Sequence, residues 1–229
     1  MRKNLYIYIF LVLFLLVFSF PLNAGYIVER AQDGYYFYLP TIVIKGEKPL
    51  ILICFPNEKI GAKEEIKSWS NLAEKNGFLV IELDIKYEEL FDEFKIFTLY
   101  QKIEDILKNL YKDYRIKEPD IYLVGTSKGG QLALFLALKF PKKFNRIALV
   151  NGAKLNSDLE LYLENAKDLK FYLIHQFKNN EITIIDFDYT RTRLEKNGAI
   201  VEFYVFYEDN GIMSVDLYEK LSSLLIESK

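Results

Sequence analysis

The sequence predicts one α/β domain, built on a mainly parallel sheet with helices on both faces. From residue 35 onward, short apolar, β-branched or aromatic runs alternate with stretches whose apolar residues have helical spacing. Strands that alternate with helices pair in parallel through right-handed crossovers, and both faces of such a sheet must be covered. The chain has 229 residues, which is ample for one domain and short for two.

The expected strands are short runs with few charges. The first two follow each other without an intervening helix, so the first is expected to pair antiparallel at an edge of the sheet. The runs are Tyr35–Leu39, Leu50–Phe55, Phe78–Leu83, Ile121–Val124, Arg146–Val150, Lys170–Ile174 and Ile200–Tyr207.

The expected helices lie between most of these runs. Residues 63–76 end at Gly77 and residues 190–197 end at Gly198, and glycine just after a helix is a common C-terminal signal. Leu132–Leu138 is apolar on all sides, which predicts a buried helix. One apolar stripe recurs in steps of three and four, over Ile96, Tyr100, Ile103, Leu107, Leu110 and Tyr114.

Composition and charge exclude several classes of function. Hydrophobic residues make up 51% of the chain and charged residues 27%, which is typical of a globular protein. The 30 basic residues are balanced by 32 acidic ones, so no nucleic-acid partner is expected. Cys54 is the single cysteine and His175 the single histidine, which excludes an internal disulfide and clustered cysteine–histidine zinc sites. We therefore expect neither a metal nor a cofactor.

The N-terminus has the pattern of an export signal. Met1–Lys3 is basic, residues 5–20 carry no charge, and Pro21–Ala24 supplies a helix breaker and a small residue. A signal peptide over residues 1–24 leaves one domain over 25–229 and predicts a secreted or extracytoplasmic protein. The alternative is an uncleaved anchor, and only in that case is association with a membrane expected.

The motif that carries chemistry lies where an expected strand meets the buried helix. Gly125-Thr126-Ser127-Lys128-Gly129 has the form Gly-x-Ser-x-Gly, and Gly130 follows. This pattern is typical of a nucleophile elbow, in which a serine lies on a strained turn and glycines let strand and helix approach closely. Ser127 is thus the candidate nucleophile, and the backbone N–H of Lys128 is one candidate oxyanion donor. A tight turn that serves packing alone is the alternative.

With this motif, the chain resembles the α/β-hydrolase superfamily. It looks most like secreted esterases and polyhydroxyalkanoate-depolymerase-like proteins, with prolyl-oligopeptidase-type hydrolases as distant kin. The resemblance implies a sheet with no large cap domain, and hydrolysis of esters or amides by Ser, Asp/Glu and His in that chain order. It covers about residues 35–226 and is carried by residues 36–40, 50–55, 69–84, 120–130, 140–144, 150–152 and 170–207.

Several positions depart from the pattern that this resemblance implies. The second oxyanion donor usually follows the early central strand, where this chain has Pro56, which lacks an N–H, so that Asn57 is the nearest substitute. Asn179 stands where the orienting aspartate is expected, with Glu181 two residues away. Asn210 is the nearest equivalent of the catalytic histidine, and asparagine cannot accept the serine proton.

Two functions remain open. In the first, the chain is a secreted hydrolase-fold protein with a degenerate triad, which retains the surface over Ser127 for a small ester, glycan or peptide ligand. In the second, it is an active serine hydrolase that uses Ser127 with His175 or an unusual base. His175 follows a different strand from the expected catalytic histidine, so a structural role is the alternative for this residue.

Overall fold

The structure is a computed structural model, and it describes residues 25–44, 49–87, 93–116, 119–144, 146–177, 182–207 and 213–226. The expected signal peptide, together with Asn179, Glu181 and Asn210, lies outside the described residues. Within the described ranges, no helix is both long enough and apolar enough to cross a membrane.

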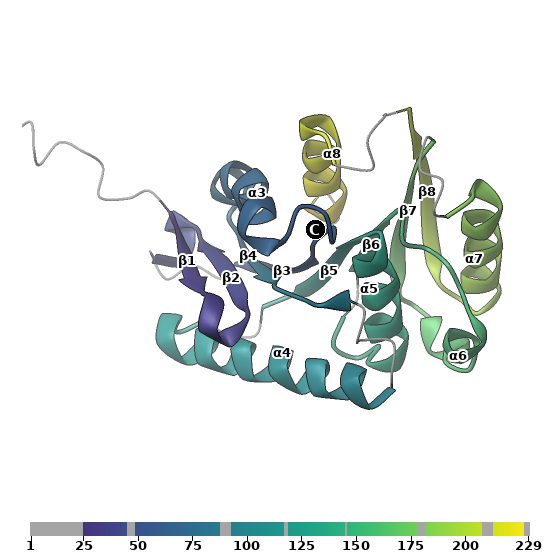
Figure 1. The fold of residues 1–229 in the computed structure, drawn as a ribbon, viewed down its shortest axis with the longest axis horizontal. Helices are drawn as coiled ribbons and strands as arrows, with labels where there is room; N and C mark the ends of the chain where they lie inside the picture. Colours follow the sequence, from purple (N-terminus) through teal and green to yellow (C-terminus); the bar gives the residue numbers. More distant parts are fainter. Residues whose placement is uncertain are drawn as a thin grey trace, which may run out of the picture.

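One sheet organises the described part of the chain (Figure 1). Its strand order is β1-β2-β4-β3-β5-β6-β7-β8, in which β2 pairs antiparallel with both β1 and β4 and the remaining neighbours pair in parallel. The strands are β1 (Tyr26–Arg30), β2 (Tyr35–Leu39), β3 (Leu50–Phe55), β4 (Phe78–Leu83), β5 (Ile121–Thr126), β6 (Arg146–Val150), β7 (Lys170–Gln176) and β8 (Ile200–Phe206).

Helices cover both faces of this sheet, as the sequence predicts. Alternate residues of each central strand belong to two separate core clusters, because successive side chains point to opposite faces. Helices α3 (Ala62–Asn76) and α8 (Val215–Ile226) close one face (Figure 1). Three helices close the other face, namely α4 (Glu93–Tyr114), α5 (Lys128–Lys139) and α7 (Ile184–Lys196).

The connections add only short elements. These are η1 (Ala31–Asp33), α2 (Thr41–Ile44), α6 (Ser157–Glu160) and η3 (Leu163–Ala166). Between β6 and β7 the chain forms only α6 and η3. The mainly parallel sheet with helices on both faces confirms the expected α/β-hydrolase fold class. The connection between β6 and β7 is too short to hold a large cap.

Two of the expectations about individual elements are wrong. Tyr35–Leu39 does pair antiparallel, but it lies between two strands, because β1 occupies the edge and pairs with it residue by residue. Helix α7 begins at Ile184 and not at Thr190. A capping box starts it early, since the Thr183 hydroxyl accepts the N–H of Asp186 while Asp186 accepts the N–H of Thr183.

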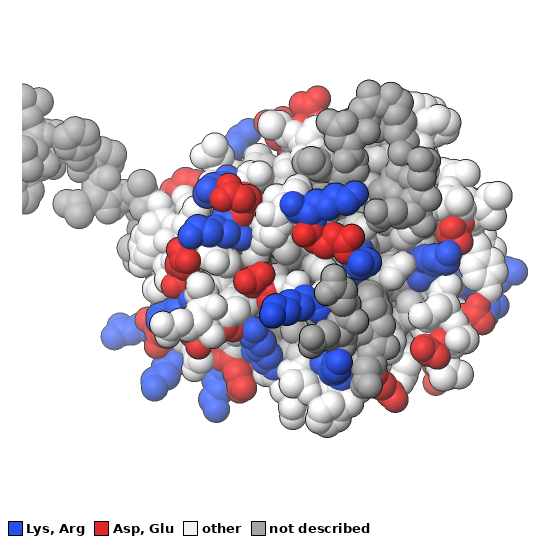
Figure 2. Space-filling model, viewed as in Figure 1, with Lys and Arg blue, Asp and Glu red and all other residues white. Residues whose placement is uncertain are grey.

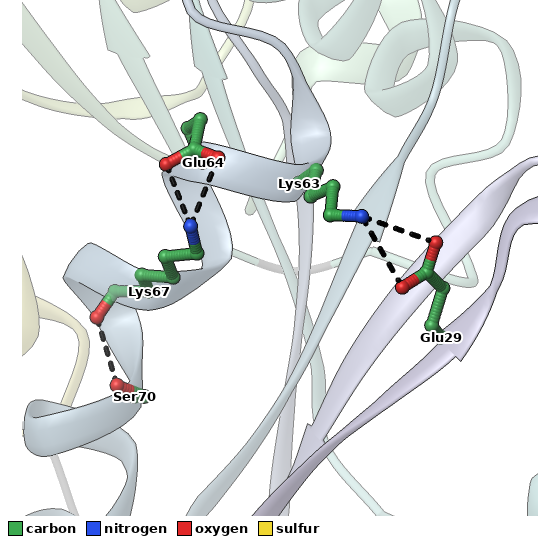
Figure 3. A network of polar contacts seen from close by, with 5 residues as sticks. All are labelled: Glu29, Lys63, Glu64, Lys67 and Ser70. Carbon is green, nitrogen blue, oxygen red and sulfur yellow. Dashed lines mark hydrogen bonds and ion pairs between the residues drawn. The ribbon is translucent and has the colours of Figure 1, made fainter.

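A surface ion pair links the edge strand β1 to helix α3. The Lys63 ammonium lies 3.4 Å from the Glu29 carboxylate, and one turn on, Lys67 pairs with Glu64 at 2.8 Å (Figure 3). All four side chains are more than half exposed, so each pair stabilises the fold by well under about 1 kcal/mol. Only the Lys63–Glu29 pair joins the edge strand to α3, since Glu64 and Lys67 both lie on that helix.

Candidate functional site

The backbone at Ser127 has the conformation that the elbow motif predicts. Ser127 lies between β5 and α5 with φ 54° and ψ −121°, in the positive-φ region that non-glycine residues rarely adopt. Its N–H donates to the carbonyl of Val150 at 2.8 Å, which ties the turn to the carboxyl end of β6. Strain of this kind costs about 1–3 kcal/mol and is most common at functional sites.

Glycines around the turn allow the close approach that holds it. A Cβ on Gly125 would lie 2.3 Å from the carbonyl of Gly129, and a Cβ on Gly129 would lie 2.3 Å from the carbonyl of Phe55. A Cβ on Gly130 would lie 2.7 Å from Cα of Gly152. These contacts are with backbone, which cannot rotate away, so the glycines are required by packing between β3, β5, α5 and the end of β6.

Lys128 opens helix α5 directly after the serine. Its backbone N–H belongs to the first turn of the helix, where N–H groups have no partner within the helix. Its ammonium pairs with the carboxylate of Glu58 at 2.8 Å. The pair connects the elbow to the loop after β3, and both side chains are partly exposed. The use of the Lys128 N–H as an oxyanion donor stays a prediction.

The loop after β3 holds Asn57 in a buried position, and the backbone N–H of this residue is already hydrogen-bonded. The Asn57 N–H donates to Oε2 of Glu65 at 3.0 Å, and its Oδ1 accepts the N–H of Lys59 at 2.8 Å. Next to it, the Tyr87 hydroxyl donates to the carbonyl of Pro56 at 2.6 Å. Asn57 as the second oxyanion donor stays a prediction, and it requires Glu65 to release this N–H.

Two buried carboxyl groups behind this loop were not anticipated from the sequence. Glu65 on α3 is 2% exposed and Glu82 on β4 is 0% exposed. Neither oxygen of Glu82 accepts a hydrogen bond from an N–H or O–H group of the described residues, and its hydrogen-bond contact is with the thiol of Cys54, its register neighbour on β3. Burial raises the pKa of Glu65 to about 7 against the opposing N–H of Asn57, and burial with the nearby Glu65 raises the pKa of Glu82 well above its usual range.

A signal for Glu82 was present in the sequence. It is the only acid in the run Phe78–Leu83, which is buried on both faces of the sheet, so an acid there has no route to solvent. Glu65 gave no such signal, because it lies on a helix with many charges. Burial also raises the pKa of the Cys54 thiol, so Cys54 is a small buried hydrophobe and not a reactive thiolate.

His175 lies at the carboxyl end of β7, on the face that α7 covers. Its ring packs against Phe187 at 5.0 Å between centroids, and the side chain is buried. Its Nδ1 has no hydrogen-bond partner among the described residues. Burial lowers the pKa of His175, which favours the neutral imidazole. The role of His175 as a base stays a prediction.

The ends of β6 and β7 are joined by two buried amide side chains that hydrogen-bond to each other's residue. Asn151 has φ 51°, and its Nδ2 donates to Oε1 of Gln176. The N–H of Gln176 donates back to Oδ1 of Asn151 at 2.8 Å. Both side chains are fully buried, so this reciprocal pair aligns the strand ends beside the elbow. Sequence reasoning did not single out either residue.

The charge pattern on the visible face of the molecule is mixed. Basic and acidic side chains alternate over this face, with no patch of one sign (Figure 2). In the part of the chain that the structure describes, no group of three or more His, Cys, Asp or Glu side chains is arranged to hold a metal.

The chain matches a family of known sequences over part of its length. Residues 103–212, somewhat less than half of the chain, match the family described as BAAT/acyl-CoA thioester hydrolase C terminal. This stretch contains the elbow, β6, β7 and β8. No curated protein matches the chain significantly.

Solved structures match the whole arrangement at low sequence identity. A fluorophosphonate-binding serine hydrolase of Staphylococcus aureus has a TM-score of 0.67 at 12% identity, covering 89% of this chain and 98% of that one. An esterase of Pyrococcus furiosus has a TM-score of 0.64 at 14% identity, covering 84% and 83%. An α/β-hydrolase enzyme from a deep-sea metagenome library of the Medee basin has a TM-score of 0.64 at 18% identity, covering 90% and 100%. At these identities the likeness establishes the fold alone.

Proposed function

We propose that this member of the α/β-hydrolase superfamily retains the nucleophile elbow but has lost the triad, and that it binds a ligand instead of turning one over. The ligand is a small ester, a glycan or a peptide, held over the carboxyl ends of the central strands, where open α/β sheets bind ligands. Any remaining esterase activity is weak.

The position of the single histidine is the observation that carries this proposal. A serine hydroxyl is a poor nucleophile unless an adjacent base takes its proton. His175 is the only histidine in the chain, and it packs under α7 against Phe187. An enzyme without a working triad retains about 10³–10⁴-fold acceleration over water, from binding and the oxyanion hole.

The state of the loop after β3 supports the same proposal. An oxyanion hole needs preorganised donors aimed at the position where negative charge develops. The N–H of Asn57 is already bonded to a carboxylate, and the preceding Pro56 has no N–H. The Lys128 N–H is then the remaining predicted donor, so stabilisation of a tetrahedral intermediate is reduced as well.

An active serine hydrolase is the second candidate, favoured by the backbone of the elbow. The positive φ of Ser127 and the glycine contacts around it are retained, although the conformation is costly. The match to an acyl-CoA thioester hydrolase family adds thioesters to the substrates worth testing. In this case His175 or an unusual base takes the proton of Ser127.

A comparison of the protein with Ser127→Ala separates the two candidates. Both are treated with a fluorophosphonate probe, short p-nitrophenyl esters and an acyl thioester. We expect little labelling or turnover, with no difference between the two proteins. Efficient labelling or turnover that disappears in Ser127→Ala would overturn the proposal and establish the second candidate.

We also propose that residues 1–24 direct export and are removed. The basic start, the uncharged run and the small residue at Ala24 support this. Expression of the full chain in a bacterial host, followed by fractionation and N-terminal sequencing, tests it. We expect a mature protein that begins at Gly25, whereas an intact N-terminus in the membrane fraction would establish the anchor.

A further inference from the structure

We propose that strand β8 is an interaction surface whose partner is a second copy of this chain, paired antiparallel so that one sheet runs through both copies. β8 ends the sheet on the side opposite to β1 (Figure 1). Among the described strands it is hydrogen-bonded to β7 alone. Such an edge presents a row of unpaired N–H and C=O groups to a further strand. The surface does not include Ser127, so it is independent of the function proposed above.

The backbone groups on the open edge belong to alternate residues of β8. The Ile200 N–H donates to the carbonyl of Leu169 at 2.9 Å, and at the other end the carbonyl of Phe206 accepts the N–H of Phe177 at 2.9 Å. Even-numbered residues of β8 therefore direct their backbone groups toward β7, because these groups point to the two sides of a strand alternately. The residues whose N–H and C=O groups lie on the open edge are Val201, Phe203 and Val205.

β8 lacks the features that keep an edge strand from pairing. It is seven residues long and contains no proline, glycine or lysine. Its one charged residue, Glu202, is paired with Lys170 of β7 at 2.8 Å. Two of its apolar side chains remain well exposed, Ile200 at 57% and Val205 at 37%. The opposite edge strand, β1, is shorter and ends in an acid and a base, so β8 is the edge that favours a partner strand.

The side chains of β8 are complementary to a second copy of the same strand. With Phe203 on the two-fold axis, Val201 lies opposite Val205 of the second copy, and Glu202 lies opposite Tyr204 of the second copy. β-branched and aromatic side chains are those that stabilise cross-strand pairs. The Glu202 carboxylate already accepts the hydroxyl of Tyr204 within its own chain, so the same kind of contact is available across the junction.

Neighbouring registers are less favourable. Moving the axis to Glu202 sets this carboxylate directly opposite its own copy, and like charges in that position are destabilising. Moving the axis to Tyr204 sets Glu202 opposite the apolar ring of Phe206 and sets Val201 beyond the end of the other strand. One register is therefore selected by the strand itself, and this self-complementarity identifies a second copy as the partner.

Sedimentation velocity of the full protein over a range of concentrations tests the pairing, and we expect a monomer–dimer equilibrium. Val205→Pro removes an N–H from the open edge and leaves the hydrogen bonds to β7 in place, since proline is tolerated on the solvent side of an edge strand. It should weaken dimerisation about tenfold or more, in a protein that circular dichroism shows to be folded. The matched control is Val205→Thr, which retains the N–H and a β-branched side chain and should dimerise like the parent protein.

Disulfide cross-linking tests the register. Cys54 is the single cysteine and is buried, so introduced thiols react without competition. Cα atoms of a hydrogen-bonded antiparallel pair lie about 5.5 Å apart, within reach of a disulfide. Val201→Cys combined with Val205→Cys should therefore give a covalent dimer under mild oxidation. Val205→Cys alone should give none, since the two copies of this residue lie at opposite ends of the junction.

Three results would overturn the proposal. The first is a parent protein that stays monomeric at every concentration, and the second is a folded Val205→Pro that dimerises as well as the parent. The third is a cross-linking pattern in which the double cysteine variant gives no covalent dimer, or in which Val205→Cys alone gives as much. The cross-linking result decides the question if Val205→Pro fails to fold.

Discussion

The buried carboxyl pair makes the stability of this protein depend on pH in an unusual direction. The test substitution is Glu65→Gln, which keeps the size of the side chain and an oxygen to accept the N–H of Asn57 but removes the titration. Folding raises the pKa of Glu65 from 4.5 to about 7, so the folded protein holds a proton that the unfolded chain releases between these values. Stability therefore falls as pH rises through that window.

The size of this effect follows from the shift. Each pKa unit corresponds to about 1.4 kcal/mol, so Glu65 alone lowers the free energy of unfolding by about 3 kcal/mol from the acid to the alkaline side of the window. Glu82, whose pKa burial and the neighbouring Glu65 raise, adds in the same direction. His175 acts oppositely below its ordinary pKa of 6.5, but it is present in both proteins and cancels in the difference.

Urea unfolding followed by circular dichroism, at pH values below, within and above the window, measures the difference. We expect Glu65→Gln to gain about 3 kcal/mol relative to the parent on passing from the acid to the alkaline side. The control is Glu64→Gln, which removes a neighbouring exposed carboxylate paired with Lys67. Its free energy of unfolding should change with pH in the same way as that of the parent protein. Parallel curves for Glu65→Gln and the parent would refute the assignment of a buried, proton-holding carboxyl group.

Three further outcomes are expected. Gly129→Ala places a Cβ 2.3 Å from the carbonyl of Phe55 and should lower the free energy of unfolding by about 1–3 kcal/mol in urea titrations; an unchanged value would contradict the close packing of the elbow. Asn151→Ala removes the amide that pairs with Gln176 and leaves buried polar groups without a partner, so it should lower the free energy of unfolding by about 1–3 kcal/mol in the same assay. An unchanged free energy of unfolding would show that the amide pair is solvated. Asn210→His combined with Asn179→Asp should raise hydrolysis of p-nitrophenyl esters measurably, and a folded variant with no gain would show that these positions do not correspond to the triad.

Most strands were predictable because their signal is local. A run such as Leu50–Phe55 is apolar on both faces, and only a strand covered on both sides buries it fully, so its bounds agree with those of β3. The strand β1 was missed because Tyr26–Arg30 is mostly exposed and has no clear periodicity of its own. It becomes a strand through its pairing with β2, which is a contact between segments and not a property of its residues.

The elbow was predictable in the same local way, and its neighbours were not. The spacing of glycines around Ser127 predicts the backbone conformation of a single turn, and the structure contains a turn of that conformation. The bond between the Asn57 N–H and Glu65 joins a loop to a helix, and the amide pair of Asn151 joins two strand ends. Such pairings depend on how elements pack, so they leave little trace in the order of residues.

By itself, the sequence determined the α/β architecture, the turn that carries Ser127 and the fact that only one histidine is present. These follow from short-range patterns of apolar residues and glycines, and from counting. Only the tertiary structure decided that this histidine is packed against Phe187, that the N–H after Pro56 is held by a carboxylate, and that two glutamates are buried behind the loop. Burial and hydrogen bonding are set by what lies across the sheet, and it is these that determine whether a side chain can take or hold a proton.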